Sequence, residues 1–299
     1  MRDELDRNTY LTAFPASDAA AFALDPTVLR FQDKLTWPKK AGSVGLETPP
    51  SQTFGSTAEL ISASSELEYP LIVKPNLKRF LAVRIKSSEQ LAAYQGDGPL
   101  IVQQYIDAPA RGVLGLMWRG RLAGAVHLRY LRVWPYPCGT AAAAETISAD
   151  TNLEERLEAF FTDFEGIFHV DMLGSYLIDV NPRVHATLPA AAAAGANLVG
   201  MYCDLLAGAP VRPMRGRPGV FYRWIEGDLR SVFRGVRERR LTIRSAVAAL
   251  APRRATAHSF ERLDDPAPML MRVGLAVRRV ASPPAPTRLS MKEPTPRSH

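Results

Sequence analysis

The chain has 299 residues, of which 46% are hydrophobic and 22% charged, and its formal net charge is +7. This length allows two or three lobes, because a single core stops growing at roughly 250 residues. The sequence contains no apolar run of the roughly 20 residues that span a bilayer, no secretory signal and no disulfide framework or metal-ligand spacing at Cys138 and Cys203. We therefore expect a cytoplasmic protein with no membrane partner.

Residues 1–50 are predicted to be a short helical connector. Asp25-Pro26 is expected to begin a helix, since proline suits the first helical turn. Pro38 is expected to end or kink that helix, because a proline inside a helix lacks the backbone donor. The glycines and prolines that follow predict a loop up to residue 50.

Residues 51–106 are predicted to form the first lobe. Ser56 and Glu59 have the spacing of a capping box and indicate the start of a helix. We expect a strand at 69–75, a second helix that begins at 87 and a second strand at 100–106.

Residues 107–210 are predicted to form the second lobe, in which strands and helices interleave. The strands are expected at 112–117, 121–130, 169–173 and 175–180, and the helices at 151–164 and 187–207. Several strands are joined as hairpins, which predicts an α+β fold with antiparallel sheets rather than a doubly wound parallel sheet.

Residues 211–280 are predicted to be a small basic region with helices at 227–236 and 243–251, followed by a disordered tail at 281–299 that is rich in proline, serine and charge. The arginines of this region indicate either a solvated helix face or a site for an anionic substrate. Nucleic acid is not an expected partner, because no aromatic-and-basic pattern of an RNA-binding module accompanies them.

The segment 166–187, GIFHVDMLGSYLIDVNPRVHAT, predicts a tight β-hairpin that carries two aspartates. Asp171 and Asp179 lie at an even spacing through the turn, on strands that must pair, so their carboxylates would be close. Close carboxylates repel unless a cation separates them, and Mg²⁺ does this well, with Asn181 adding a neutral oxygen. The alternative is that Asp179 caps the loop and Asp171 faces solvent.

Two lysines are candidates for contact with phosphate. Lys74 ends the apolar strand Leu71-Ile-Val-Lys-Pro75, and a cation at the end of a rigid strand is well placed for a phosphate. The alternative for Lys74 is a side chain that extends to solvent at the strand end. Lys34 is a weaker candidate and could be a helix surface residue.

Together these segments resemble the ATP-grasp superfamily, specifically its carbamoyl-phosphate-synthetase-like and carboxylate–amine ligase branch. The resemblance covers about residues 25–210 and depends on the order of the segments, since none is specific alone. The matching segments are Asp33-Lys34 with Gly45–Pro49, Tyr69–Pro75, Val102–Ile106, Arg129–Pro135 with Cys138-Gly139, Leu177–Arg183, Ala190–Gly195 and, more loosely, Asp264–Pro268.

The resemblance implies two lobes whose antiparallel sheets, covered by helices, clasp ATP. It implies that Asp171, Asp179 and Asn181 hold Mg²⁺ and that Lys74 and Lys34 neutralise phosphate charge. It further implies that the adenine edge meets the hinge residues Gln103, Gln104, Tyr105 and Ile106. Arg132 and Arg183 would steady the transferred phosphoryl group or the substrate carboxylate. No nucleophilic side chain is required, so Cys138, Cys203 and His185 are read as structural.

The implied activity is that of an ADP-forming ligase that activates a carboxylate as an acyl phosphate for attack by an amine. Both substrates would be small molecules. Two alternatives remain open: an ATP-grasp carboxylase or thioester-forming ligase, and a degenerate ATP-grasp protein that binds nucleotide or serves as a scaffold.

The sequence departs from the family pattern in three ways. Residues 76–84 have no glycine where a glycine-rich phosphate loop is usual, although Lys78 and Arg79 could clamp phosphates. Asp179 stands where glutamate is common. The α/β domain that normally precedes the fold is represented only by its last elements. Because the missing domain would leave apolar surface uncovered, we expect poor solubility, an oligomer or a partner chain that supplies this domain.

Overall fold

The computed structural model describes residues 14–76, 82–96, 98–253, 256–261 and 264–272. These residues belong to two units, Met1–Ser259 and Phe260–His299. The first unit contains all the sheets described below, and the second includes a helical turn at residues 267–272. Lys78, Arg79 and the predicted tail at 281–299 lie outside the described residues.

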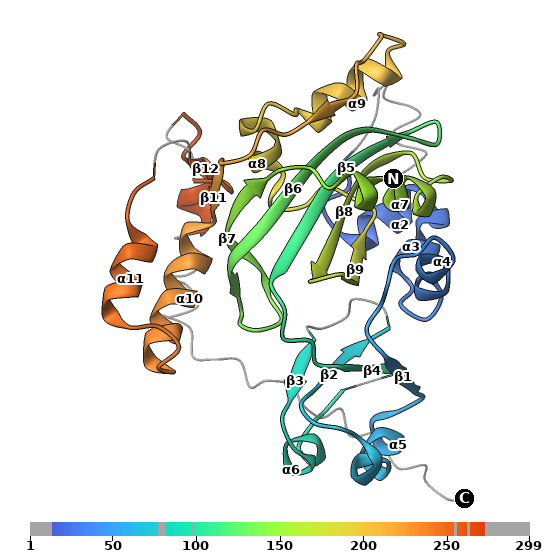
Figure 1. Cartoon of the computed structure of the whole chain (residues 1–299), viewed down its shortest axis with the longest axis vertical. Coiled ribbons are helices and arrows are strands. Elements are labelled where there is room, and N and C mark those ends of the chain that lie inside the picture. Colours follow the sequence, from blue (N-terminus) through green and yellow to red (C-terminus); the bar gives the residue numbers. More distant parts are fainter. Residues whose placement is uncertain (1–13, 77–81, 97, 254–255, 262–263, 273–299) are drawn as a thin grey trace, which may run out of the picture. The chain divides into compact units, whose positions relative to one another are not determined.

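A four-stranded antiparallel sheet with the strand order β1-β4-β2-β3 forms within the predicted first lobe (Figure 1). Its strands are β1 (Ser51–Phe54), β2 (Leu71–Pro75), β3 (Val83–Ile85) and β4 (Leu100–Gln104). Its helices are α5 (Thr57–Ser62), η2 (Ser64–Glu66) and α6 (Ser88–Ala92). Buried Leu60 and Leu91 on the helices share one core with Val73 and Leu100 on the strands.

Serine caps define the starts of α5 and α6. The Ser56 hydroxyl accepts a hydrogen bond from the Glu59 backbone N–H at 3.2 Å, as predicted. The Glu59 carboxylate accepts from the Gly55 N–H at 2.7 Å, one residue before the position that a full capping box requires. Ser87 caps α6 in the same way.

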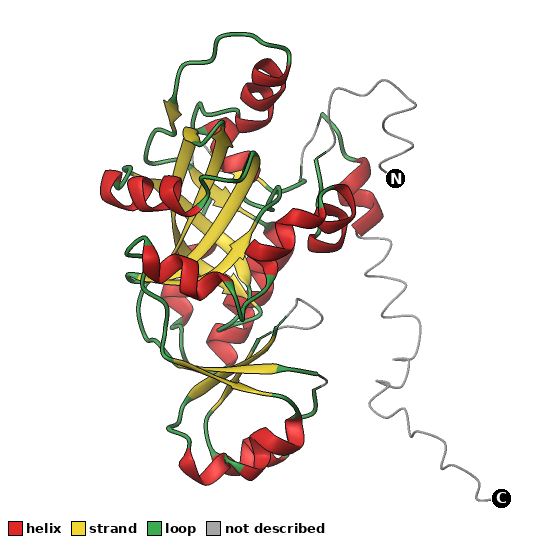
Figure 2. Ribbon diagram, turned by 90° about the vertical axis from the view of Figure 1, so that its right-hand side faces the viewer, coloured by secondary structure: helices red, strands yellow, loops and turns green. Residues whose placement is uncertain are grey.

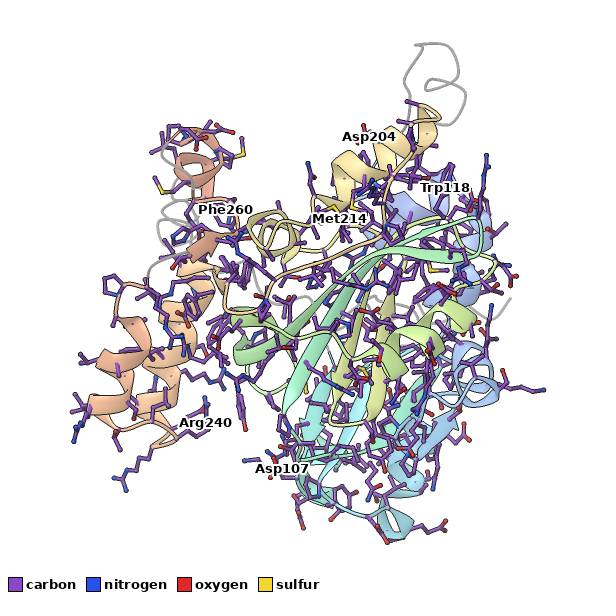
Figure 3. All side chains as sticks on the ribbon, turned by 45° about the horizontal axis from the view of Figure 1, so that its top comes forward. Asp107, Trp118, Asp204, Met214, Arg240 and Phe260 are labelled. Carbon is purple, nitrogen blue, oxygen red and sulfur yellow. The ribbon has the colours of Figure 1, made fainter. Side chains whose placement is uncertain are left out.

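The larger sheet has the order β12-β11-β7-β6-β5-β8-β9, and the short strand β10 pairs with β6. Its strands are β5 (Ala110–Trp118), β6 (Arg121–Trp134), β7 (Thr140–Ile147), β8 (Gly166–Leu173), β9 (Tyr176–Asn181), β10 (Met214–Arg215), β11 (Phe221–Arg223) and β12 (Thr256–His258). Neighbouring strands are antiparallel except for the pairs β11–β12 and β10–β6. Asp107 lies in the connection from β4 to β5, and Trp118 lies at the end of β5 (Figure 3). The predicted α+β class with antiparallel sheets is confirmed.

Helices cover both faces of this sheet (Figure 2). Because side chains alternate along a strand, Val113 and Met117 of β5 join one core while Leu114 and Leu116 join the other. The first core is covered by α2 (Asp18–Leu24), η1 (Pro26–Val28), α3 (Leu29–Gln32), α4 (Trp37–Ser43) and α7 (Thr151–Phe160). The second is covered by α8 (Leu188–Ala193) and α9 (Leu198–Leu206).

Two helix predictions are corrected by the structure. Pro38 does not end or kink the helix that begins at Pro26, because that helix has already ended at Asp33 and Pro38 lies in the first turn of α4. The single helix expected at 187–207 is two helices, α8 and α9. Gly195 separates them with φ +91, a left-handed conformation that ends a helix.

Strand β7 had no counterpart among the predicted elements. Its central residues, Ala141 to Ala144, are fully buried between neighbouring strands. Alanine is depleted in strands, so local propensity gives no signal there. Burial in the sheet therefore decides the conformation of this segment.

The basic region after residue 210 adds β10, β11 and β12 to the larger sheet. It also contains α10 (Ile225–Arg237) and α11 (Ile243–Leu250), which contact each other, and α10 contacts β6 and β7 as well. The predicted domain boundaries themselves stay predictions. In the part of the chain that the structure describes, no helix is long and apolar enough to span a membrane.

Candidate functional site

The β8–β9 hairpin brings the two predicted aspartates together. Asp171 and Asp179 are direct cross-strand partners in the antiparallel register, as the spacing predicted. The two residues of the turn, Gly174 and Ser175, would by themselves place Asp171 opposite Ile178. A β-bulge next to Asp171 shifts the register by one residue and places it opposite Asp179 instead. The bulge therefore decides which side chains meet at this site.

Both predicted lysines lie at strand β9. The Lys34 ammonium is 3.5 Å from Asp179 Oδ1, and the side chains of these two residues are 7% and 20% exposed. The Lys74 ammonium donates a hydrogen bond at 3.0 Å to the carbonyl of Ile178, the residue before Asp179. Lys34 precedes α4 and Lys74 lies in β2, so the fold brings two cations from distant parts of the sequence to one strand.

Asn181, at the end of β9, is buried and links Asp179 to Arg183. Its amide nitrogen donates to Asp179 Oδ2 at 3.3 Å, and its amide oxygen accepts from Arg183 at 3.0 Å. The Arg183 guanidinium also donates to Asp18 Oδ1 at 2.8 Å. The structure therefore brings Asp179, Asn181 and Arg183 together, with Arg183 bound to protein acceptors on two sides.

Tyr130 and His169 also belong to this cluster, although the sequence interpretation assigned them no role. The Tyr130 hydroxyl is 2.7 Å from Asp171 Oδ1 and 2.8 Å from His169 Nε2. Burial, followed by the nearby Asp171 charge, raises the pKa of Tyr130 well above its ordinary value, so the phenol stays protonated at neutral pH. The sequence carried one signal: His169 and Asp171 are two residues apart on one strand, so their side chains lie on the same face of the sheet.

His185, predicted to be structural, stacks on His169. The two rings are parallel within 4° and their centroids are 3.7 Å apart. The His185 Nδ1 is 3.0 Å from the hydroxyl of buried Thr187. Cys138, also predicted to be structural, is deprotonated only at high pH, since burial raises its pKa to about 11.

Arg132 contacts the helices that follow residue 224, and its predicted role at the phosphoryl group stays a prediction. Its guanidinium forms a bidentate pair with Asp228 of α10 and donates to the Ala249 carbonyl of α11 at 3.3 Å. Asp228 is fully buried and also pairs with Arg223 at 3.0 Å. The contacts of Arg132 in the structure are thus with α10 and α11 rather than with the carboxylates of β8 and β9. A buried carboxylate needs cationic partners, which is the physical reason for this placement.

The four residues predicted to meet adenine lie at the end of β4 and just after it. Gln103 is buried and donates to the Ser51 hydroxyl at 3.0 Å, whereas Gln104 is exposed and its backbone N–H donates to the Pro50 carbonyl at 3.0 Å. Tyr105 and Ile106 follow β4 and are half-buried. Their predicted role stays a prediction.

The donor atoms at β8 and β9 fit a hard cation that is shared with phosphate. The described residues contain no group of three or more His, Cys, Asp or Glu side chains that could hold a metal by themselves. Two carboxylates and an amide oxygen, beside two lysines, suit Mg²⁺, which binds one or two carboxylates together with substrate phosphates. The set therefore fits a metal–nucleotide complex better than an isolated metal ion.

No family model and no curated protein sequence matches this chain. Solved structures do match. N5-carboxyaminoimidazole synthase from Aspergillus clavatus, in complex with ADP and 5-aminoimidazole ribonucleotide, has 14% identity and a TM-score of 0.53 over 68% of this chain and 61% of its own. L-amino acid ligase from Bacillus licheniformis has 18% identity and a TM-score of 0.51 over 69% of this chain and 58% of its own.

A third similar structure is the biotin carboxylase domain of 2-oxoglutarate carboxylase from Hydrogenobacter thermophilus, in complex with MgADP, ADP and bicarbonate. It has 14% identity and a TM-score of 0.52 over 66% of this chain and 50% of its own. The chain thus spans between 50% and 61% of the length of these three proteins. All three are ATP-grasp enzymes. The chain therefore has the fold of the ATP-grasp superfamily.

Proposed function

We propose that this chain is an ATP-dependent ligase that activates a carboxylate as an acyl phosphate for attack by an amine. The observation that carries the proposal is the convergence of Lys34 and Lys74 on the strand that bears Asp179, directly opposite Asp171, within an ATP-grasp fold. An ADP complex and an L-amino acid ligase among the similar structures support the same class of reaction.

In this proposal the residues act by position and charge. Asp171, Asp179 and Asn181 hold Mg²⁺, which when bound neutralises phosphate charge and orients the terminal phosphates. Lys34 and Lys74 supply further positive charge beside them. A substrate carboxylate oxygen bonds to the γ-phosphorus as ADP leaves, and the amine then displaces inorganic phosphate from the acyl carbon.

Arg183 is the arginine that this proposal retains for the substrate or the phosphoryl group. It already contacts Asn181, and a guanidinium suits bidentate contact with a carboxylate or phosphate. Arg132 is not assigned a catalytic role here, because it is engaged by Asp228. The hinge residues Gln103, Gln104, Tyr105 and Ile106 keep their predicted role beside adenine.

Thermal unfolding with ATP, with and without Mg²⁺, tests the site. A ligand at 100 times its dissociation constant adds about 2.7 kcal/mol of stability, so the parent should show a clear Mg²⁺-dependent rise in melting temperature. Asp179→Ala should lose that rise. Asp163→Ala, which removes an exposed carboxylate paired with Lys40, is the matched control and should keep it.

ADP release tests the reaction. Pairs of carboxylates and amines that turn over should release ADP in the parent and the Asp163→Ala control but not in Asp179→Ala. Analysis of the product then separates an amide from a carboxylated compound or a thioester. Stabilisation without ADP release from any pair would contradict the ligase function.

A nucleotide-binding or scaffold protein is the second candidate. It is favoured by the fact that protein groups already engage the candidate cations: Lys34 pairs with Asp179 and Lys74 binds the Ile178 carbonyl. ATP would have to compete for these cations. The ADP-release assay separates this candidate from the ligase.

A further inference from the structure

A hydrogen-bonded chain of side chains crosses three strands of the larger sheet. Tyr130 lies on β6 and Asp171 on β8, with β5 between them. The Tyr130 hydroxyl nevertheless contacts both Asp171, at 2.7 Å, and His169, at 2.8 Å. The tyrosine ring must therefore extend over β5 to reach these partners.

Gly112 on β5 leaves the space for this contact. It is the β5 residue directly opposite Asp171 in the register. A Cβ atom at Gly112 would lie 2.4 Å from the Tyr130 hydroxyl oxygen and 2.8 Å from His169 Nε2, closer than such atoms can approach. The glycine is thus a steric requirement for the hydrogen bonds between Tyr130, His169 and Asp171.

The chemistry of the partners fixes the direction of the hydrogen bonds. A carboxylate only accepts, so the Tyr130 hydroxyl donates to Asp171. Its oxygen then accepts from His169 Nε2–H, and the other ring nitrogen, Nδ1, lies 3.6 Å from Asp171 Oδ2. The Asn181 amide nitrogen lies 3.5 Å from that Nδ1. His169 therefore lies between Tyr130, Asp171 and Asn181 and contacts all three.

This arrangement restrains the carboxylate of Asp171. His169 is completely buried and stacked on His185, so its ring is fixed in place and holds the phenol in turn. Residues that orient a metal ligand by hydrogen bonding, without touching the metal, commonly change metal affinity by 10–100-fold when they are mutated. The contact from β6 is the kind of support that such a ligand requires.

We propose that Tyr130, held by His169 over Gly112, is a positioning residue that fixes the Asp171 carboxylate as a ligand for the nucleotide-bound cation. The proposal rests on the proposed nucleotide site but does not require the ligase reaction. In this role Tyr130 acts through Asp171 and not by contact with the cation or the substrate.

The test is a Mg²⁺ titration at fixed ATP, followed by thermal unfolding, on the parent and on Tyr130→Phe. Tyr130→Phe removes the hydroxyl and keeps the ring, so the protein should remain folded while the Mg²⁺ midpoint rises about tenfold. Stabilisation by ATP without Mg²⁺ should be unchanged. Tyr202→Phe, at a partly buried tyrosine of α9 whose ring contacts Trp118, is the matched control and should keep the parent midpoint.

A Mg²⁺ midpoint for Tyr130→Phe equal to that of the parent would overturn the proposal, as would a parent with no Mg²⁺-dependent stabilisation. An equal rise in Tyr202→Phe would also overturn it, because the effect would then come from a general loss of stability. If the parent is stabilised but releases no ADP, the ligase function fails, while a raised midpoint in Tyr130→Phe still supports the positioning role.

Discussion

Asp228 shows how a buried charge determines the environment of its neighbours. Its carboxylate is completely buried and is held by Arg132 and Arg223 from two strands of the sheet. Replacing it with alanine leaves two guanidinium groups without this acceptor. Because breaking a buried ion pair costs roughly 3–5 kcal/mol, Asp228→Ala should lower the free energy of unfolding, measured in urea, by about that amount.

Glu238→Ala is the control for Asp228→Ala. Glu238 pairs with Arg234 and Arg240 on the surface, where water and salt weaken ion pairs, so its removal should change stability little. An Asp228→Ala protein as stable as the parent would mean that Arg132 does not depend on Asp228. The predicted role of Arg132 at the phosphoryl group stays a prediction in either case.

At the scale of elements, the site depends on contacts between strands. Gly112→Ala would place a methyl group 2.4 Å from the Tyr130 hydroxyl, so the ring must move away from Asp171. Overpacking of this kind costs roughly 1–3 kcal/mol. We expect a lower melting temperature, and a Mg²⁺ midpoint with ATP that rises as in Tyr130→Phe.

Gly42→Ala is the matched control for Gly112→Ala. Gly42 lies in α4, nothing lies within 4 Å of a Cβ built there, and alanine favours helices. This variant should keep the Mg²⁺ midpoint and at least the parent stability. A Gly112→Ala protein with the parent midpoint would show that Tyr130 reaches Asp171 without needing this glycine.

The hairpin also shows how far an element can be predicted from its sequence. The alternating pattern and the turn at Gly174 predicted both strands, whereas the pairing of Asp171 with Asp179 was predicted from their even spacing alone. The bulge that produces this register was not predicted, since extra residues in a strand leave no clear mark in an apolar run. Strand β7 was missed because its alanines become a strand through burial.

At the scale of the whole molecule, the division into two units suggests a truncation. All candidate site residues, from Lys34 to Arg183, lie in the unit Met1–Ser259. A chain that ends at Ser259 should therefore keep the Mg²⁺-dependent stabilisation by ATP that is expected of the full chain. The two melting curves, with and without ligand, are the measurement.

Loss of the ATP response in a folded truncated chain would mean that residues after Ser259 contribute to the site.

The predicted oligomer or partner chain stays a prediction. Five large apolar side chains of α10 and α11 are exposed, namely Ile225, Leu229, Phe233, Ile243 and Val247. Exposed apolar residues of this kind are common at surfaces where proteins associate.

The sequence by itself determined the α+β class, the resemblance to the ATP-grasp superfamily, the helix caps and the hairpin that carries the two aspartates. These features depend on local patterns of a few residues or, for the resemblance, on the order of such patterns along the chain. Only the tertiary structure decided that Tyr130 reaches Asp171 across Gly112 and that Arg132 pairs with Asp228. Such contacts join residues 41 and 96 positions apart. They follow from strand order and register, which no local propensity specifies.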